Sequence, residues 1–459
     1  MGRRGAAACP RIRREVRPRM SFLETVPEVR HPAPGVALLC APESRYKRAL
    51  CELHFDRPLD RPAPARTLLC PILEQGTRRH PTRMHLTRAL EDLYGASAHF
   101  DSDRVAEMQR VSLELSWVGE RFLPPADAGG GRVAAGILSL AMELLEDPVR
   151  GAGAPFPAET FARERDQLLR RIRSLRDDRQ AYATERFLAL LCAGEPLGRP
   201  PYGTEEEVLA LTAEDVEAAR RELLEQAPVT AVAVGPLDPA QIERHLASWL
   251  GAGGAHAGAR RAALPPPVLV TPQRLREERE DLPVDQARFF FGFRFHPPAG
   301  PEELEALTLA NGVLGGGAHG RLFRRVREER SLAYGIYSTI RAKKGILTVE
   351  AGIDAGAYEE VRDEVLAQVE LMARGAFEDA ELEMARANVL NDLHGLQDSA
   401  AALSHFYTRE LNLGFLRAPA QRAAQLQRVR RDEVAAAAAG WQADLVYLLA
   451  GTRQPVEVA

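Results

Sequence analysis

The stretches FPAETFARERDQLLRRI (Phe156–Ile172) and FEDAELEMARANVLNDL (Phe377–Leu393) follow the same pattern. Each begins with Phe, continues with an acidic first turn, and then has the apolar spacing of a long amphipathic helix. The equivalent positions are Leu168 and Val389, Leu169 and Leu390, Ile172 and Leu393, and Asp177 and Asp398. Similarity at one fixed offset indicates an internal repeat, so we expect a duplicated architecture.

A second pair of segments has nearly the same offset. AEDVEAARRELLEQAPVTAVAVGPL (213–237) and RDEVAAAAAGWQADLVYLLAGT (431–452) each predict a helix with acidic residues in its first turn, followed by a short buried strand. These strands end at Gly235 and Gly451. A third pair is LTRALEDLYGAS (86–97) and LFRRVREERSLAYGIYS (322–338). The repeats predict an α+β protein built from two related domains.

The strands that can be recognised have one apolar face. In VSLELSW (111–117), apolar residues alternate with serine and glutamate, as expected of a strand covered on one side only. ARFFFGFRF (Ala287–Phe295) and ILTVEAGI (Ile346–Ile353) are predicted to be central strands of the second sheet. We therefore expect each domain to consist of an antiparallel sheet packed against helices.

The composition along the chain suggests four segments. Residues 1–29 begin with seven arginines in the first twenty positions, which indicates a disordered basic tail or an overlong gene start with Met20 as the initiator. Residues 30–250 and 279–459 are the two predicted domains. Between them, residues 251–278 contain GAGGAHAGARRAALPPPVLVTPQR, whose glycines, alanines and prolines are typical of a linker.

Bulk composition excludes several classes of protein. The 459 residues are 45% hydrophobic and 27% charged, and the net charge of −4 gives no electrostatic reason to expect nucleic acid or an anionic membrane as a partner. No apolar run reaches the roughly 18 residues of a membrane span. The N-terminus lacks the apolar core of a secretory signal, so we expect a cytoplasmic protein. The five scattered cysteines suit reduced thiols.

No motif gives a catalytic centre from the residues alone. A formal G-x-G-x-x-G at Gly315, Gly317 and Gly320 follows a segment with helical spacing, whereas a dinucleotide fingerprint follows a strand. We interpret it as a turn between helices. The chain contains no H-x-x-E-H, no H-x-H, no Cys/His cluster and no G-x-S-x-G elbow.

Several motifs nevertheless carry a resemblance to a known family. They are LEQGTRRHPT (73–82), LEDLYGAS (90–97), LGGGAHGRLFRRVREERSLAYGIYS (314–338) and DLVYLLAG (444–451). Across residues 30–459, the chain resembles the pitrilysin/insulinase-type (M16) zinc metallopeptidases of the short, two-subunit or homodimeric class. Within that class it is similar to the bacterial branch labelled for association with 5-aminopentanol modification of elongation factor P. The resemblance implies a half clamshell of two M16/LuxS-like domains.

In active relatives the zinc helix reads H-x-x-E-H and is followed by Gly-Thr. Anchored on Gly76 and Thr77 of TLLCPILEQGT, the two histidines fall on Thr67 and Pro71, and the glutamate base falls on Cys70. The resemblance therefore implies that the first domain lacks its zinc helix ligands.

The third zinc ligand of the family is a glutamate seven residues after the glutamate of a Glu-Arg pair. Glu164 and Arg165 retain the start of this pattern, but the ligand position is Arg171. No metal is therefore expected in this chain. We interpret Cys70 as a core thiol, since no histidine adjoins it in the sequence, and Glu74 as a surface group of its helix.

The second domain retains a different element of the family. Active relatives use an arginine and a tyrosine, seven residues apart, to hold the substrate backbone near the scissile bond. REERSLAY places Arg327 and Tyr334 at that spacing. A guanidinium and a phenol can both donate hydrogen bonds to a carbonyl that is becoming an oxyanion.

This pattern predicts a zinc-free subunit that pairs with an M16 homologue with an intact H-x-x-E-H, which supplies the zinc, and that encloses an extended peptide or protein substrate. Arg327 and Tyr334 would support the substrate in trans. The alternative is a scaffold that binds a client without proteolysis and is linked to elongation factor P modification. A third interpretation is an independent enzyme with an unforeseen site at Cys70.

Overall fold

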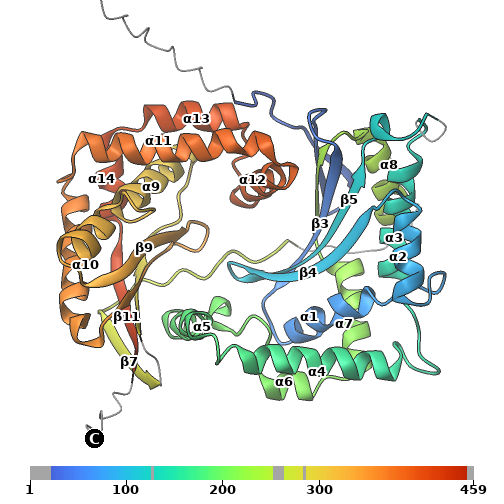
Figure 1. Ribbon diagram of the computed structural model, residues 1–459, viewed down its shortest axis with the longest axis horizontal. Helices are drawn as coiled ribbons and strands as arrows, with labels where there is room; N and C mark the ends of the chain where they lie inside the picture. The colour runs from blue at the N-terminus through green and yellow to red at the C-terminus, as the bar shows by residue number, and fades with distance from the viewer. Residues whose placement is uncertain (1–21, 126–128, 252–262, 283–285, 452–459) are drawn as a thin grey trace, which may run out of the picture.

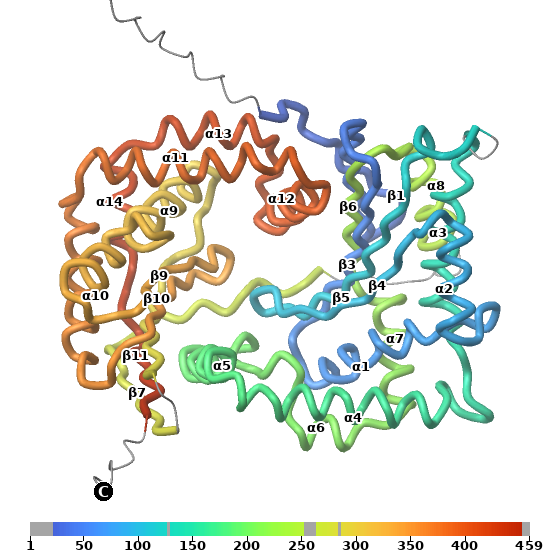
Figure 2. Tube along the Cα trace, in the orientation of Figure 1, coloured from blue at the N-terminus to red at the C-terminus, as the bar shows by residue number. Residues whose placement is uncertain are grey.

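The computed structural model describes residues 22–125, 129–251, 263–282 and 286–451, which form two α+β halves facing one another (Figures 1 and 2). The first half contains β1 (Val29–Ala33), β2 (Val36–Pro42), β3 (Arg48–Pro58), α1 (Ala63–Leu73), α2 (Arg83–Glu91), β4 (Ser97–Val105), β5 (Met108–Val118), η1 (Glu120–Phe122), α3 (Arg132–Glu146), α4 (Ala158–Ser174), α5 (Arg179–Leu191), η2 (Pro196–Gly198), α6 (Glu205–Leu209), α7 (Ala213–Gln226), β6 (Val229–Gly235) and α8 (Pro239–Leu250). The second half contains β7 (Arg276–Leu282), β8 (Ala287–Arg294), α9 (Pro301–Leu314), η3 (Phe323–Glu329), β9 (Ala333–Arg341), β10 (Ile346–Ile353), η4 (Ala355–Ala357), α10 (Tyr358–Ala373), α11 (Asp379–Gly395), η5 (Leu396–Asp398), α12 (Ala400–Leu413), α13 (Pro419–Arg428), α14 (Arg431–Ala439) and β11 (Gln442–Gly451).

The two sheets share one topology, which confirms the predicted duplicated α+β fold. The first sheet has the order β1-β2-β6-β3-β5-β4 and the second β7-β11-β8-β10-β9. Apart from β1, each strand of the first sheet therefore has a counterpart in the second. The sheets are not wholly antiparallel, because β2 pairs with β6, and β7 with β11, in parallel. β6 and β11 are the last strands of their halves, and each follows a series of helices in the chain. Parallel pairing requires a long crossover connection of this kind.

Local sequence explains where the repeated elements begin and end. Thr212 and Asp215 form a capping box at the start of α7, in which each side chain accepts a hydrogen bond from the backbone N–H of the other residue. The alternation predicted for 111–117 is present in β5, whose apolar side chains are buried under helices. The predicted strand 346–353 matches β10, and β8 ends one residue before the predicted boundary at Phe295.

One helix of each half packs against the sheet of the other half. Phe187 and Leu191 of α5 share a buried cluster with Phe290 of β8 and Tyr447 of β11, and the Phe187 and Phe290 rings stack with their centres 5.1 Å apart. In the same way, α12 covers β3 and β6 of the first sheet (Figure 1). Both helices occupy the inner faces of the sheets, so the two halves are interlocked.

Polar contacts match α12 to β3 at regular intervals. The Ser404 hydroxyl donates to Glu52, and the Thr408 hydroxyl lies 3.5 Å from His54 Nε2. Asn412 accepts from Arg110 at 2.9 Å, and Arg110 also donates to Asp56. Glu52, His54 and Asp56 alternate along β3, while the three helix residues recur every fourth position. Four helical residues advance about 6 Å and two strand residues about 6.6 Å, so the two spacings coincide.

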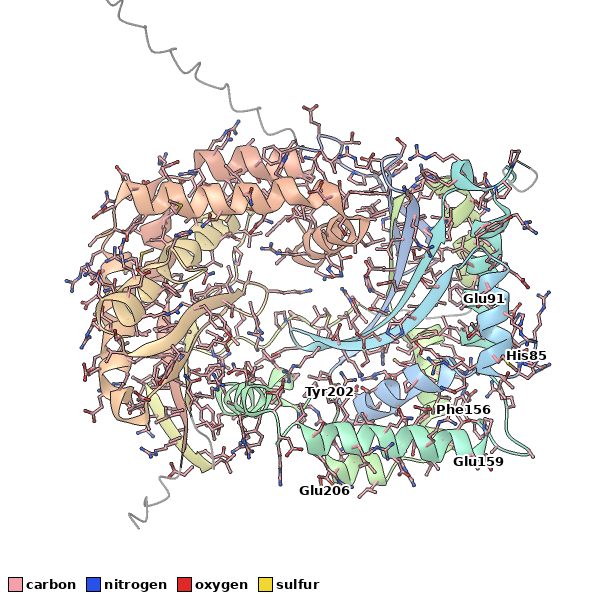
Figure 3. The ribbon with its side chains drawn as sticks, in the orientation of Figure 1. His85, Glu91, Phe156, Glu159, Tyr202 and Glu206 are labelled. Carbon is pink, nitrogen blue, oxygen red and sulfur yellow. The ribbon has the colours of Figure 1, made fainter. Side chains whose placement is uncertain are left out.

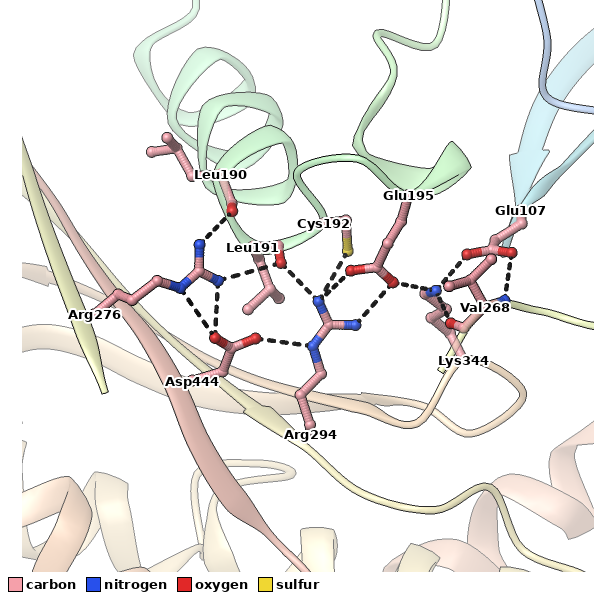
Figure 4. Close-up of polar contacts among 10 residues, drawn as sticks. All are labelled: Glu107, Leu190, Leu191, Cys192, Glu195, Val268, Arg276, Arg294, Lys344 and Asp444. Atoms are coloured by element: carbon pink, nitrogen blue, oxygen red, sulfur yellow. Dashed lines mark hydrogen bonds and ion pairs between the residues drawn. The ribbon is translucent and has the colours of Figure 1, made fainter. Parts of the chain in front are cut away.

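A chain of alternating charges also joins the halves (Figure 4). Lys344, in the β9–β10 turn, donates to Glu107 of the β4–β5 turn, to Glu195, and to the backbone carbonyl of Val268. Arg294 then bridges Glu195, at 2.6 Å, and Asp444, at 2.9 Å, and Arg276 donates to Asp444. A buried cluster of this kind is stable only when every charge has a partner, as it has here.

The predicted segment boundaries can be compared with the described residues. Within the predicted tail, the carbonyl of Leu23 accepts from Ala420 N at 3.0 Å, and Phe22 packs edge-on against His394. Residues 1–21, including Met20, and most of the glycine-rich part of the predicted linker lie outside the described residues. Strand β7 begins at Arg276, within the last part of that linker. The four cysteines in the described part of the chain are buried and free.

Candidate functional site

The four degenerate zinc positions come together in the first half. Thr67, Cys70 and Pro71 of α1 and Arg171 of α4 line one pocket of about 440 Å³, next to β4. Thr67 and Pro71 are one helical turn apart on α1, as two histidine ligands would be. The three positions assigned from Gly76 and Thr77, and the fourth assigned from Glu164 and Arg165, therefore surround one space.

The Gly-Thr pair has a structural reason. Gly76 has φ +144°, and a Cβ there would lie 2.3 Å from the carbonyl oxygen of His80. Thr77 is fully buried, and its hydroxyl accepts a hydrogen bond from His80 N at 3.0 Å. The pair thus ends α1 in a tight turn whether or not the helix carries ligands.

Thr67 is held in a hydrogen-bond network. Its hydroxyl accepts from Gln109 Nε2 at 2.9 Å and lies 3.2 Å from Ser102 Oγ. The same Gln109 accepts from the fully buried Arg66 at 2.7 Å. A histidine at this position would have to break that network.

Cys70 has the environment of a core thiol, as the sequence predicts. Its Sγ lies 3.5 Å from the Arg66 carbonyl oxygen, and complete burial raises the pKa of the thiol well above its usual range. The thiolate is the form that attacks substrates or binds metal. Burial therefore disfavours both roles. It also argues against an independent enzyme with a site at Cys70.

Arg171 closes the pocket at the C-terminal end of α4. Its guanidinium carbon lies 4.2 Å from the centre of the Tyr202 ring, and Tyr202 is labelled above this end of α4 in Figure 3. Glu164, where the family pattern starts, is buried and accepts from Arg163 Nε at 2.9 Å. A guanidinium has no lone pair to offer a metal.

The residues present therefore do not fit zinc. A threonine hydroxyl in a filled network, a neutral thiol, a proline and an arginine stand at the positions of the ligands and the base. Among the described residues, no group of three or more histidine, cysteine, aspartate or glutamate side chains could hold a metal ion.

Glu74 differs from the prediction. It is not a free surface group of α1, because its carboxylate accepts from Phe100 N at 2.7 Å and lies 2.7 Å from His99 Nδ1. The side chain joins the end of α1 to the edge strand β4. No local pattern indicates this contact, since Glu74 and its partners are 25 and 26 residues apart.

Arg327 lies on a different kind of element. It belongs to η3, a seven-residue π-helix, and its exposed guanidinium lies 4.6 Å from the centre of the Phe323 ring. The neighbouring Arg321, Arg324, Arg325 and Arg330 each form an ion pair with a glutamate. Among the described residues, no carboxylate lies within ion-pair distance of Arg327. Its hydrogen-bond donors are therefore available.

Tyr334 is the extra residue of a β-bulge. Along β10, Gly352 pairs with Gly335 and Ile353 pairs with Ala333, so no residue of β10 is opposite Tyr334. Its side chain is 65% exposed. Strand β9 is an edge strand, since it pairs only with β10. Bulges re-aim a side chain, and they are common next to functional sites.

The structure does not bring this pair into the pocket of the zinc positions. Neither Arg327 nor Tyr334 lines that pocket, and the two belong to the second half of the chain.

None of the helices in the described part of the chain combines the length and apolar character needed to span a bilayer.

Comparison with known proteins gives the family. The model described as "Peptidase M16 inactive domain" matches residues 210–389, which span parts of both halves. A Bacillus subtilis protein named "Probable inactive metalloprotease YmfF" is 26% identical over 399 residues, covering 84% of this chain and 89% of the relative. "Uncharacterized zinc protease ML0855" of Mycobacterium leprae is 30% identical over 309 residues, covering 66% of this chain and 67% of the relative.

The fold is likewise that of a solved structure. A conserved protein from Enterococcus faecalis V583 superimposes with a TM-score of 0.82 at 23% identity, covering 94% of this chain and all of that one. With the replaced zinc positions, these comparisons lead to one conclusion. The chain belongs to the M16 peptidase family, as an inactive member.

Proposed function

We propose that this chain is the zinc-free subunit of a two-subunit, M16-type peptidase in the cytoplasm. The partner is an M16 homologue with an intact H-x-x-E-H, and it supplies the zinc, the glutamate base and the activated water. This chain contributes Arg327, Tyr334 and half of the wall of a peptide chamber.

The observation that carries the proposal is the availability of Arg327. Four of the arginines around it are neutralised by glutamates, whereas Arg327 keeps its donors free. An exposed guanidinium can donate hydrogen bonds to the oxygen of a peptide carbonyl or of an oxyanion.

Tyr334 supports the same role. A phenol on an exposed bulge of an edge strand can reach a peptide that lies along the strand, while the strand offers unpaired backbone groups. Positioning of this kind lowers a barrier by holding the substrate in the reactive geometry.

The test uses the complex of this chain with the H-x-x-E-H homologue from the same genome. Arg327→Ala and Tyr334→Phe should each lower hydrolysis of fluorescein-labelled casein by about tenfold or more, with the amount of complex unchanged on size exclusion. Arg325→Ala is the matched control, because it removes an exposed arginine of the same helix that is paired with Glu329. Full activity of both variants would remove the assigned roles.

Binding without hydrolysis is the second candidate function. A pocket whose ligand positions are filled by other chemistry favours a chain that keeps a binding surface and has lost its reaction. The suggested link to elongation factor P modification belongs to this candidate, with the modified factor or a modifying enzyme as the client. Complex formation with a client, in the absence of any peptide cleavage, would favour it.

A further inference from the structure

The segment from Arg327 to Tyr334 departs from regular backbone at three places. It begins in the π-helix Phe323–Glu329, passes through Ser331 at φ +52°, and ends in the bulge at Tyr334. A seven-residue π-helix is rare, and a left-handed residue other than glycine is uncommon. These three features lie within a dozen residues that include Arg327 and Tyr334, the two residues proposed to bind the substrate.

Hydrogen bonds from Ser331 and Leu332 join the end of the π-helix to the residues before β9. The Ser331 N–H donates to the carbonyl oxygen of Arg327 at 3.1 Å, and Leu332 N donates to that of Val326 at 2.8 Å. Val326 is fully buried, so the turn is anchored in the core. The arrangement resembles the left-handed C-cap of an α-helix, widened to suit a π-helix. The direction in which the chain leaves Arg327 towards Tyr334 is thus determined by the backbone angles of Ser331.

Glycine is the usual residue at such a cap. A serine in the left-handed region is strained, whereas glycine adopts this conformation without a steric clash. Glycine would relieve that strain, but it would also let the chain between Arg327 and Tyr334 take many more conformations. The exposed serine side chain has no core contact to justify its presence. Strain of this kind is retained where the geometry itself is needed.

We propose that Ser331 is a positioning residue, which fixes the separation and orientation of Arg327 and Tyr334 before substrate binds. The inference rests on the proposed function, because it deepens the role of that same pair. Ser331 acts through backbone stiffness and does not touch the substrate.

The test compares three substitutions in the complex with the H-x-x-E-H homologue, using fluorescein-labelled casein. Ser331→Gly should raise the melting temperature or leave it unchanged, and should lower kcat/KM about tenfold through lost preorganisation. Ser331→Asn should keep kcat/KM within about twofold, because asparagine tolerates the left-handed region without the freedom of glycine. Ala106→Gly is the matched control, since Ala106 also has φ +52° but lies in the β4–β5 turn.

The outcomes separate this inference from the proposed function. If Arg327→Ala and Tyr334→Phe lower kcat/KM but Ser331→Gly does not, Ser331 has no positioning role and the proposed function stands. If Ser331→Asn is as damaging as Ser331→Gly, the serine hydroxyl matters and the backbone account is wrong. If none of the variants at these three positions changes kcat/KM, the proposed function itself fails.

Discussion

Lys344 of the second half and Glu107 of the first form a buried ion pair where the tips of two hairpins meet. Lys344 also binds Glu195, which is in turn held by Arg294 (Figure 4). Together with the exchanged helices α5 and α12, this pair fixes one half of the chain against the other. In the proposed complex, any opening that admits a substrate is therefore expected between subunits and not within this chain.

Removal of Lys344 should destabilise the chain strongly. Lys344→Met leaves the buried Glu107 carboxylate without its cation and removes one of the two cations that hold Glu195, which should lower the free energy of unfolding by about 3–5 kcal/mol. Urea denaturation measures the difference. Arg374→Met, which breaks an exposed pair with Glu370 on one helix, is the control and should cost about 0.5 kcal/mol or less. Similar losses for the two variants would contradict the role given to the buried network.

Acid should weaken the seam between α12 and β3. Burial lowers the pKa of His54 to about 3, from 6.5 for an ordinary histidine. Between these values the unfolded chain binds a proton that the folded chain excludes, so stability falls as the pH drops through this window. Above pH 6.5 both states are neutral at this residue and the effect vanishes.

The contribution of His54 can be measured by substitution. It can reach about 1.4 kcal/mol per pH unit. In His54→Gln, whose amide can still hydrogen-bond Ser112, the stability difference between pH 7 and pH 5 should shrink by about 2 kcal/mol. An unchanged difference in urea denaturation would show that His54 does not titrate in this way.

Neither half should fold as an independent unit. Residues 22–250 alone would expose Phe187 and Leu191 of α5, which are buried in a cluster with side chains of the second sheet. Each half produced singly should aggregate or bind a hydrophobic dye, and the two halves produced together should co-purify as one complex. A soluble, cooperatively unfolding single half would show that the exchanged helices are dispensable.

The pocket on α1 should bind zinc when the family's ligands are introduced. Thr67→His, Cys70→Glu, Pro71→His and Arg171→Glu, combined, place three ligands and a base around the existing pocket. One zinc ion per chain is the expected result by metal analysis after dialysis. The variant with only the two histidine substitutions is the control and should retain much less zinc. No gain of zinc in the fourfold variant would contradict the assignment of these four positions to a zinc site.

Local patterns allowed much of the fold to be predicted. Helical spacing and acidic first turns identified α4, α11 and α7, and the bounds of β10 followed from an apolar run between turns. The family resemblance assigned Thr67, Cys70 and Pro71 from Gly76-Thr77, and Arg171 from Glu164-Arg165, and the structure gathers these four residues around one pocket.

Features that depend on distant contacts could not be predicted. The apolar face of α5 indicates a helix but does not say that its partner sheet lies in the other half. The parallel pairs, the partners of Glu74 and the buried charges depend in the same way on residues far apart in the sequence. The π-helix and the left-handed Ser331 oppose local preference, and tertiary packing holds them.

The most direct test of the account is the zinc content and peptidase activity of this chain and the H-x-x-E-H homologue, each alone and mixed. We expect a one-to-one complex with one zinc ion that cleaves fluorescein-labelled casein, while this chain alone binds no zinc and cleaves nothing. A homologue that is fully active by itself, or two chains that do not associate, would contradict the proposal that this chain supplies half of a shared site.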